Sequence, residues 1–191
     1  MVDLEAISKE GGKILRARKR VLEILGGENA CTAWYQEKDS NPAATFRTLS
    51  FVLDRKGEDS VRESRETGSL TVFRNPYVAK VMQADGPYAT VTINEKGAFF
   101  SPVARVIEVS KEGGPITMRV PRLLHVGPYT GDTLPAQVVT LLHEFGHLVD
   151  LLPSDEGDQD GKSVRNTEAV LHYCRPEIES RVRRNALTAT R

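Results

Sequence analysis

The chain has 191 residues, of which 39% are hydrophobic and 27% are charged, a balance typical of one folded domain rather than of a disordered or fibrous protein. Lysine and arginine together number 26, and so do aspartate and glutamate, so no net charge would attract nucleic acid or an anionic membrane. No run of about 18 apolar residues occurs, which excludes a membrane span. We therefore expect a single domain over residues 1–191 that has neither nucleic acid nor a membrane as its partner.

The start of the chain and its two cysteines bear on localisation. Residues 1–10 lack the basic opening and the apolar stretch of a signal peptide, so either the protein is cytoplasmic or a leader is missing from this chain. Cys31 and Cys174 show no CxxC spacing and do not form a cysteine zinc site by themselves. They are either two buried thiols or one long-range disulfide, and a disulfide would indicate export.

The first part of the chain predicts an amphipathic helix and then a polar segment. Apolar residues recur at helical spacing from Lys13 to Leu25, and Gly26 and Gly27 end the pattern. Basic residues lie between the apolar ones, and we interpret them as a solvated face rather than a nucleic-acid patch: Arg16, Arg18, Lys19 and Arg20. Residues 57–67 are polar apart from Val61 and predict a surface loop or an exposed helical turn.

The middle of the chain predicts strands. Short runs rich in valine, isoleucine, threonine and aromatic residues are separated by turns that contain glycine or proline. These runs are Leu70 to Phe73, Tyr77 to Met82, Tyr88 to Ile93, Phe99 to Val109 and Ile116 to Val120. We expect them to form one sheet. Because helical sequence follows the strands, the expected fold class is α+β.

A helix that carries a metal-binding motif is predicted next. A capping residue and an early proline begin it, and it should run from about Leu134 to Leu152, just before Pro153. His143 and His147 lie four residues apart and project from one face on neighbouring turns. Both imidazoles can then reach one cation at the ~2.0–2.1 Å of a zinc–nitrogen bond. The spacing predicts a Zn²⁺ site.

Glu144 follows the first histidine and is the candidate catalytic residue. Its carboxylate can accept a proton from a metal-bound water without filling a coordination position. Zinc lowers the pKa of that water to ~7 and polarises the carbonyl under attack, so hydrolysis of an amide is favoured. Apolar residues cover most of the helix circumference, so we expect this helix to be buried, and its polar stripe must find partners inside the protein.

The segment TLLHEFGHLVD resembles the active-site helix of the zincin superfamily of metallopeptidases. The resemblance implies that His143 and His147 ligate zinc, that Glu144 is the general base and acid, and that the substrate is a peptide or protein. It also implies a zincin-like fold, with a mixed or antiparallel sheet before the buried motif helix and a second helix at the C-terminal end. An edge strand of that sheet would pair with substrate, and residues 88–94 or 99–109 could supply it.

A catalytic zinc normally has three protein ligands and an open position, so a third ligand is required. The metzincin pattern is excluded, because Asp150 and Pro153 stand where it needs glycine and then histidine or aspartate. The thermolysin-like pattern would supply Glu168 from a second helix. That helix is predicted over 164–174, ending before Pro176.

The helical wheel of residues 164–174 counts against Glu168, because it places this residue opposite the apolar face. Asp155, in the loop after the motif helix, is the competing third ligand. Both remain open here, with Asp158, Asp150 and His172 behind them. We interpret the acidic loop 155–160 as solvated rather than as a calcium site, because the spacing of an EF-hand is absent.

Two alternative functions remain open. Peptide deformylase shares the HExxH motif but takes a cysteine ligand from shortly before it, whereas the only upstream cysteine, Cys31, is far away. A zincin-like domain that uses its metal or fold only to bind a partner is the non-enzymatic alternative. For Tyr129 and His125 we expect structural packing rather than oxyanion stabilisation, and for Asn166 a buried hydrogen bond to the backbone.

Overall fold

The computed structural model describes residues 9–57, 59–66, 69–110, 117–155 and 161–188. Helices and strands occur together, which confirms the α+β class, and the motif helix is followed by a second helix. The helices are α1 (Lys9–Leu25), α2 (Ala30–Tyr35), α3 (Pro42–Thr48), α4 (Leu134–Leu148) and α5 (Lys162–Thr188). Within the described ranges, no helix has both the length and the apolar character needed to cross a membrane.

The first helix ends before Gly26 and Gly27 as predicted, and it begins at Lys9, earlier than the predicted Lys13. Its apolar face is buried in the core, while Arg16 and Lys19 are exposed. Arg20 corrects the prediction of a wholly solvated basic face. It is only 9% exposed, and its guanidinium donates hydrogen bonds to the backbone oxygen of Glu177 and to Ser180 Oγ on α5. The two helices at opposite ends of the chain are therefore joined by a largely buried cation.

The prediction of one sheet is wrong. A three-stranded sheet has the order β1 (Ser50–Asp54), β5 (Thr90–Asn94), β4 (Ala79–Lys80), with β1 parallel and β4 antiparallel to β5. Its apolar residues contribute to the same core as α1, α4 and α5. A separate two-stranded sheet pairs β8 (His125–Val126) with β9 (Tyr129–Thr130) and lies against α4.

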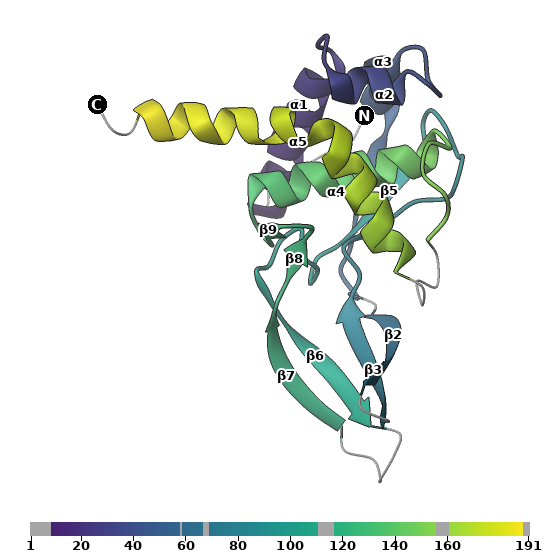
Figure 1. Ribbon diagram of the computed structural model, residues 1–191, viewed down its shortest axis with the longest axis vertical. Helices are drawn as coiled ribbons and strands as arrows, with labels where there is room; N and C mark the ends of the chain where they lie inside the picture. Colours follow the sequence, from purple (N-terminus) through teal and green to yellow (C-terminus); the bar gives the residue numbers. More distant parts are fainter. Residues whose placement is uncertain (1–8, 58, 67–68, 111–116, 156–160, 189–191) are drawn as a thin grey trace.

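A four-stranded antiparallel sheet extends away from the helices as an arm (Figure 1). Its strands, in spatial order, are β2 (Asp59–Glu66), β3 (Ser69–Pro76), β6 (Val103–Ser110) and β7 (Thr117–Leu123). The polar stretch 57–67, predicted as a surface loop or an exposed helical turn, therefore contains a strand. Pairing with β3 over its whole length supplies the backbone hydrogen bonds that side-chain polarity does not reveal.

The predicted substrate-pairing edges are also wrong, because both segments form central strands. β5 lies between β1 and β4, and β6 lies between β3 and β7. Phe99 and Phe100, expected at the start of a strand, lie instead in a buried turn before β6. Residue 116 falls outside the described ranges.

The motif helix begins as predicted and ends early. Thr133 caps it by accepting a hydrogen bond from the backbone N–H of Ala136 at 3.4 Å. The helix stops at Leu148, short of the expected Leu152, because Asp150 adopts a left-handed φ of 55°. The chain then folds back: the N–H groups of residues 151 and 152 donate to the carbonyl of Gly146 at 2.8 and 3.0 Å.

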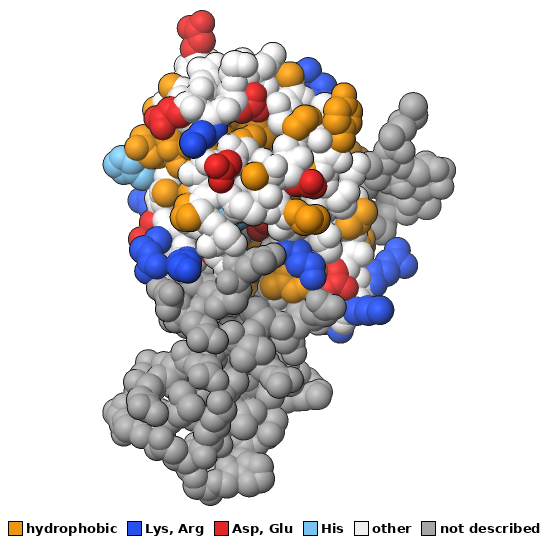
Figure 2. Space-filling view, turned by 90° about the vertical axis from the view of Figure 1, so that its right-hand side faces the viewer, with side chains coloured by type: hydrophobic (Ala, Val, Ile, Leu, Met, Phe, Trp, Pro, Cys, Tyr) orange, Lys and Arg blue, Asp and Glu red, His pale blue; other side chains and the backbone are white. Residues whose placement is uncertain are grey.

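The last helix is longer than predicted, because it continues through Pro176 to Thr188. Proline removes one backbone donor and tends to kink a helix, and α5 changes direction along its length in Figure 1. The predicted inward face is confirmed, since Val170, Leu171 and Cys174 are buried. Charged side chains of both signs are interspersed over the face of the helical body in Figure 2, in line with the balanced composition.

A disulfide between Cys31 and Cys174 ties α2 to α5 across 143 residues of sequence. A cross-link over so long a loop restricts the unfolded chain strongly. Replacing both cysteines with alanine is therefore expected to lower the free energy of unfolding by about 2–5 kcal/mol. Denaturant titration of the double variant, beside wild type with and without a reducing agent, measures the change. Equal midpoints for all three samples would contradict the prediction.

Candidate metal centre

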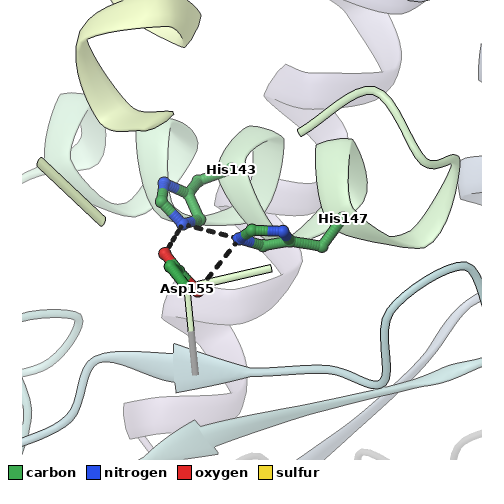
Figure 3. Close-up of side chains that lie close together, drawn as sticks. All are labelled: His143, His147 and Asp155. Carbon is green, nitrogen blue, oxygen red and sulfur yellow. Dashed lines mark hydrogen bonds and ion pairs between the residues drawn. The ribbon is translucent and has the colours of Figure 1, made fainter. Parts of the chain in front are cut away.

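Two imidazoles and one carboxylate converge beside α4 (Figure 3). His143 Nε2 lies 3.0 Å from Asp155 Oδ2, and His147 Nε2 lies 3.2 Å from Asp155 Oδ1. The two Nε2 atoms are 3.0 Å apart. Each residue thus offers one ligand atom, all three within 4.8 Å of one another, and the group could hold a metal ion.

The turn after α4 brings Asp155 back to the histidines. A Cβ on Gly146 would lie 2.6 Å from Leu152 Cδ1, so the missing side chain lets the returning chain pack against the helix. Asn166 on α5 then donates a hydrogen bond to the carbonyl of Pro153 at 2.9 Å. This confirms the predicted role of Asn166 as a buried group bonded to backbone, and it also fastens the loop that carries Asp155.

The second ring nitrogen of each histidine has a partner on another element. His143 Nδ1 lies 3.1 Å from Thr167 Oγ1 on α5, and His147 Nδ1 lies 3.1 Å from Oε1 of Gln83, between β4 and β5. These contacts orient both Nε2 atoms toward the shared point. Sequence reasoning missed Gln83, which belongs to no motif and lies far from the histidines along the chain.

Burial and opposite charges determine the electrostatics of the site. His143, Glu144 and His147 are each 5–7% exposed. Burial raises the pKa of the Glu144 carboxyl, and the negative charge of Asp155 adds to this although the two histidines oppose it. A carboxylate whose pKa is raised accepts a proton more readily.

The ligand candidates are electrostatically coupled. Burial alone would raise the pKa of Asp155, but hydrogen bonds and charge from both histidines hold it well below its usual range. Burial alone would lower the pKa of His147, but the hydrogen bond and charge of Asp155, together with the charge of Glu144 and a hydrogen bond to the backbone of Leu152, raise it. The anionic carboxylate of Asp155 thus stabilises positive charge between the two imidazoles, and a metal cation could occupy this position.

Glu168 is exposed on α5 and is not part of this group. Its neighbour Thr167 reaches His143 instead, because successive helical residues point about 100° apart. His172 is exposed, and Asp150 accepts a hydrogen bond from Gln83. Asp158 and most of the acidic loop 155–160 lie outside the described residues.

The surroundings of three further residues do not suit a part in catalysis or metal binding: Tyr129, His125 and Cys31. The Tyr129 hydroxyl donates to Glu179 Oε1 at 2.9 Å, and burial together with this bond raises the pKa of Tyr129 to about 12. This contact between β9 and α5 agrees with the packing role expected for Tyr129. His125 is exposed on β8. Cys31 is bonded to Cys174 and offers no thiolate, which argues against a deformylase-type cysteine ligand.

No protein-family model matches the chain, and neither a curated protein nor a solved structure was found to match it.

Proposed function

We propose that the protein is a zinc-dependent hydrolase of the zincin type, with peptides or proteins as its substrates. The observation that carries the proposal is the convergence of His143, His147 and Asp155 at one point, with Glu144 next to the first histidine. The ligand set is thus two imidazoles and one carboxylate, and Glu144 remains outside it.

The donor atoms support zinc as the metal. Two nitrogens and one carboxylate oxygen make up a common catalytic zinc set, which leaves the fourth position open for water. Ligand atoms at ~2.0–2.1 Å from a tetrahedral zinc lie about 3.3 Å from one another. The two Nε2 atoms lie 3.0 Å apart, and each lies close to a different oxygen of Asp155, His143 Nε2 at 3.0 Å from Oδ2 and His147 Nε2 at 3.2 Å from Oδ1, so a small rotation of the carboxylate would let one oxygen join both nitrogens at that spacing.

Each residue has a defined part in the proposed reaction. His143, His147 and Asp155 would hold the ion, which supplies a water of lowered pKa and polarises the scissile carbonyl. Glu144 takes the proton from the attacking water and afterwards delivers it to the leaving amine. Its buried position, which raises the pKa of the carboxyl, suits both steps.

Removal of the metal is expected to abolish hydrolysis. Protein treated with a chelator and then freed of it should show no turnover of a quenched fluorescent peptide library, and one equivalent of Zn²⁺ should restore it. Magnesium is the control, because it prefers oxygen ligands in octahedral geometry. Failure of the native protein to contain or take up a transition metal would overturn the proposal.

The same assay separates the alternatives. Stoichiometric zinc without turnover of any peptide would favour a domain that binds a partner. Cleavage confined to formyl-methionyl peptides would favour a deformylase-type activity.

The disulfide supports a second proposal, that the protein works in an oxidising compartment. Disulfides persist in secreted and periplasmic proteins and are rare in reducing cytosol. Thiol labelling of protein taken directly from its native cells would test this, because free Cys31 and Cys174 would contradict it.

A further inference from the structure

The segment between β4 and β5 is fastened to the end of the motif helix. The N–H of Ala84 donates to the carbonyl of His147 at 2.9 Å, and the N–H of Gly86 donates to the carbonyl of Leu148 at 3.1 Å. The last carbonyls of a helix have no partner within it, and this segment satisfies two of them. Gln83, the residue before Ala84, is therefore held beside the candidate metal ligands.

The side-chain amide of Gln83 makes three hydrogen bonds. Its Nε2 lies 3.1 Å from Asp150 Oδ1 and 2.9 Å from the carbonyl oxygen of Leu152. Its Oε1 lies 3.1 Å from His147 Nδ1. The amide thus connects one imidazole with the turn that leads from α4 to Asp155.

The chemistry of these partners determines which way the amide faces. The oxygens of Asp150 and Leu152 that face Gln83 accept hydrogen bonds, so the NH₂ group of Gln83 must point to them. Its carbonyl oxygen then faces His147 Nδ1 and can only accept. Nδ1 must therefore carry a hydrogen, so Nε2, which faces Asp155 Oδ1 and His143 Nε2, is the ring nitrogen that is left to ligate a metal.

The partner of the other histidine lacks this property. Thr167 Oγ1 can donate to His143 Nδ1 or accept from it, so the contact allows either tautomer. Of the two Nδ1 contacts, only the one from Gln83 specifies the metal-binding form of the ring.

We propose that Gln83 is a positioning residue of the metal site: it fixes a hydrogen on Nδ1 of His147, so that Nε2 is the nitrogen left for the metal, and it anchors the turn that presents Asp155. The purpose that we assign to this contact rests on the proposed function. The contact itself does not depend on a metal. Gln83 touches neither the proposed ion nor the substrate directly.

The first test measures zinc affinity by competition with a chromophoric chelator. Gln83→Met keeps the length of the side chain and removes all three hydrogen bonds, so we expect zinc binding about 10- to 100-fold weaker than in wild type. Gln36→Met, the same substitution at an exposed position after α2, is the matched control and should leave the affinity unchanged. Equal affinity of Gln83→Met and wild type would overturn the role in metal binding.

The second test locates the ring hydrogens of His147 in metal-free protein by nitrogen-15 NMR. In wild type, Nδ1 of His147 should carry a hydrogen, whatever the state of Nε2 beside Asp155, and in Gln83→Met rings with a hydrogen on Nε2 alone should appear. Gln83→Glu can still accept from Nδ1 but cannot donate to Asp150, so it should retain the wild-type tautomer. His147 without a hydrogen on Nδ1 in wild type, or no change in Gln83→Met, would overturn the inference.

The outcomes separate the two proposals. Wild type that binds no zinc but shows the expected tautomers would refute the proposed function and leave the effect of Gln83 on the ring established. Zinc-dependent hydrolysis, with equal zinc affinity and equal His147 tautomers in wild type and Gln83→Met, would support the proposed function and refute the role of Gln83.

Discussion

Glu144→Gln is expected to lower kcat/KM for peptide hydrolysis by about 10²- to 10⁴-fold, the usual contribution of a general base. Glutamine has nearly the same shape but cannot take a proton from water. Because Glu144 lies outside the group of three ligand candidates, the variant should bind one equivalent of zinc as wild type does. Steady-state kinetics together with elemental analysis of the same sample would measure both effects.

Glu168→Gln is the matched control, because it makes the same substitution at an exposed position on α5. It should keep wild-type kcat/KM. Hydrolysis by Glu144→Gln at the wild-type rate would rule out Glu144 as the base, and loss of zinc from that variant would instead indicate a ligand role.

Asp155→Ala is expected to weaken zinc binding by about 100-fold. Structural zinc sites with four protein ligands bind with about 10–16 kcal/mol, or about 3 kcal/mol for each ligand, which corresponds to this factor. Two histidines alone would then hold the ion, and activity at limiting zinc should fall in parallel. Competition titration with a chelator, followed by assay at low and saturating zinc, measures the loss.

Glu168→Ala distinguishes the two candidates for the third ligand. Its side chain is exposed and lies outside the group, so zinc affinity should be unchanged. The opposite pattern, with Asp155→Ala harmless and Glu168→Ala severe, would mean that α5 rotates to place Glu168 at the ion and would refute the ligand set proposed above.

Much of the helical structure could be predicted because its signals are local. The cap at Thr133, the apolar periodicity and the terminating glycines act within a few residues of the helix ends that they specify. The sheets were harder to predict, because a strand is completed by a partner from elsewhere in the chain. Seven of the eight residues of β2 are polar, so no apolar alternation indicates a strand, and pairing with β3 is what makes one.

The residues of the candidate site also divide into those that local sequence patterns predict and those that they do not. His143, Glu144 and His147 share one helix, and a spacing of four residues places the two histidines on one face whatever the rest of the fold does. Helical periodicity also counted against Glu168 as a metal ligand, but it could not predict that Asp155 lies at the site. That depends on the left-handed residue Asp150 and on packing against Gly146.

By itself, the sequence determined the α+β class, the position of the motif helix and the place of Glu144 beside two histidines on that helix. These features follow from residue patterns within single helices and strands and from the order of those elements along the chain. Only the tertiary structure decided that Asp155 joins them, that Gln83 and Thr167 orient the rings, and that Cys31 meets Cys174. Each of these contacts joins residues from different parts of the chain, and their closeness results from packing around a common core, which no local pattern encodes.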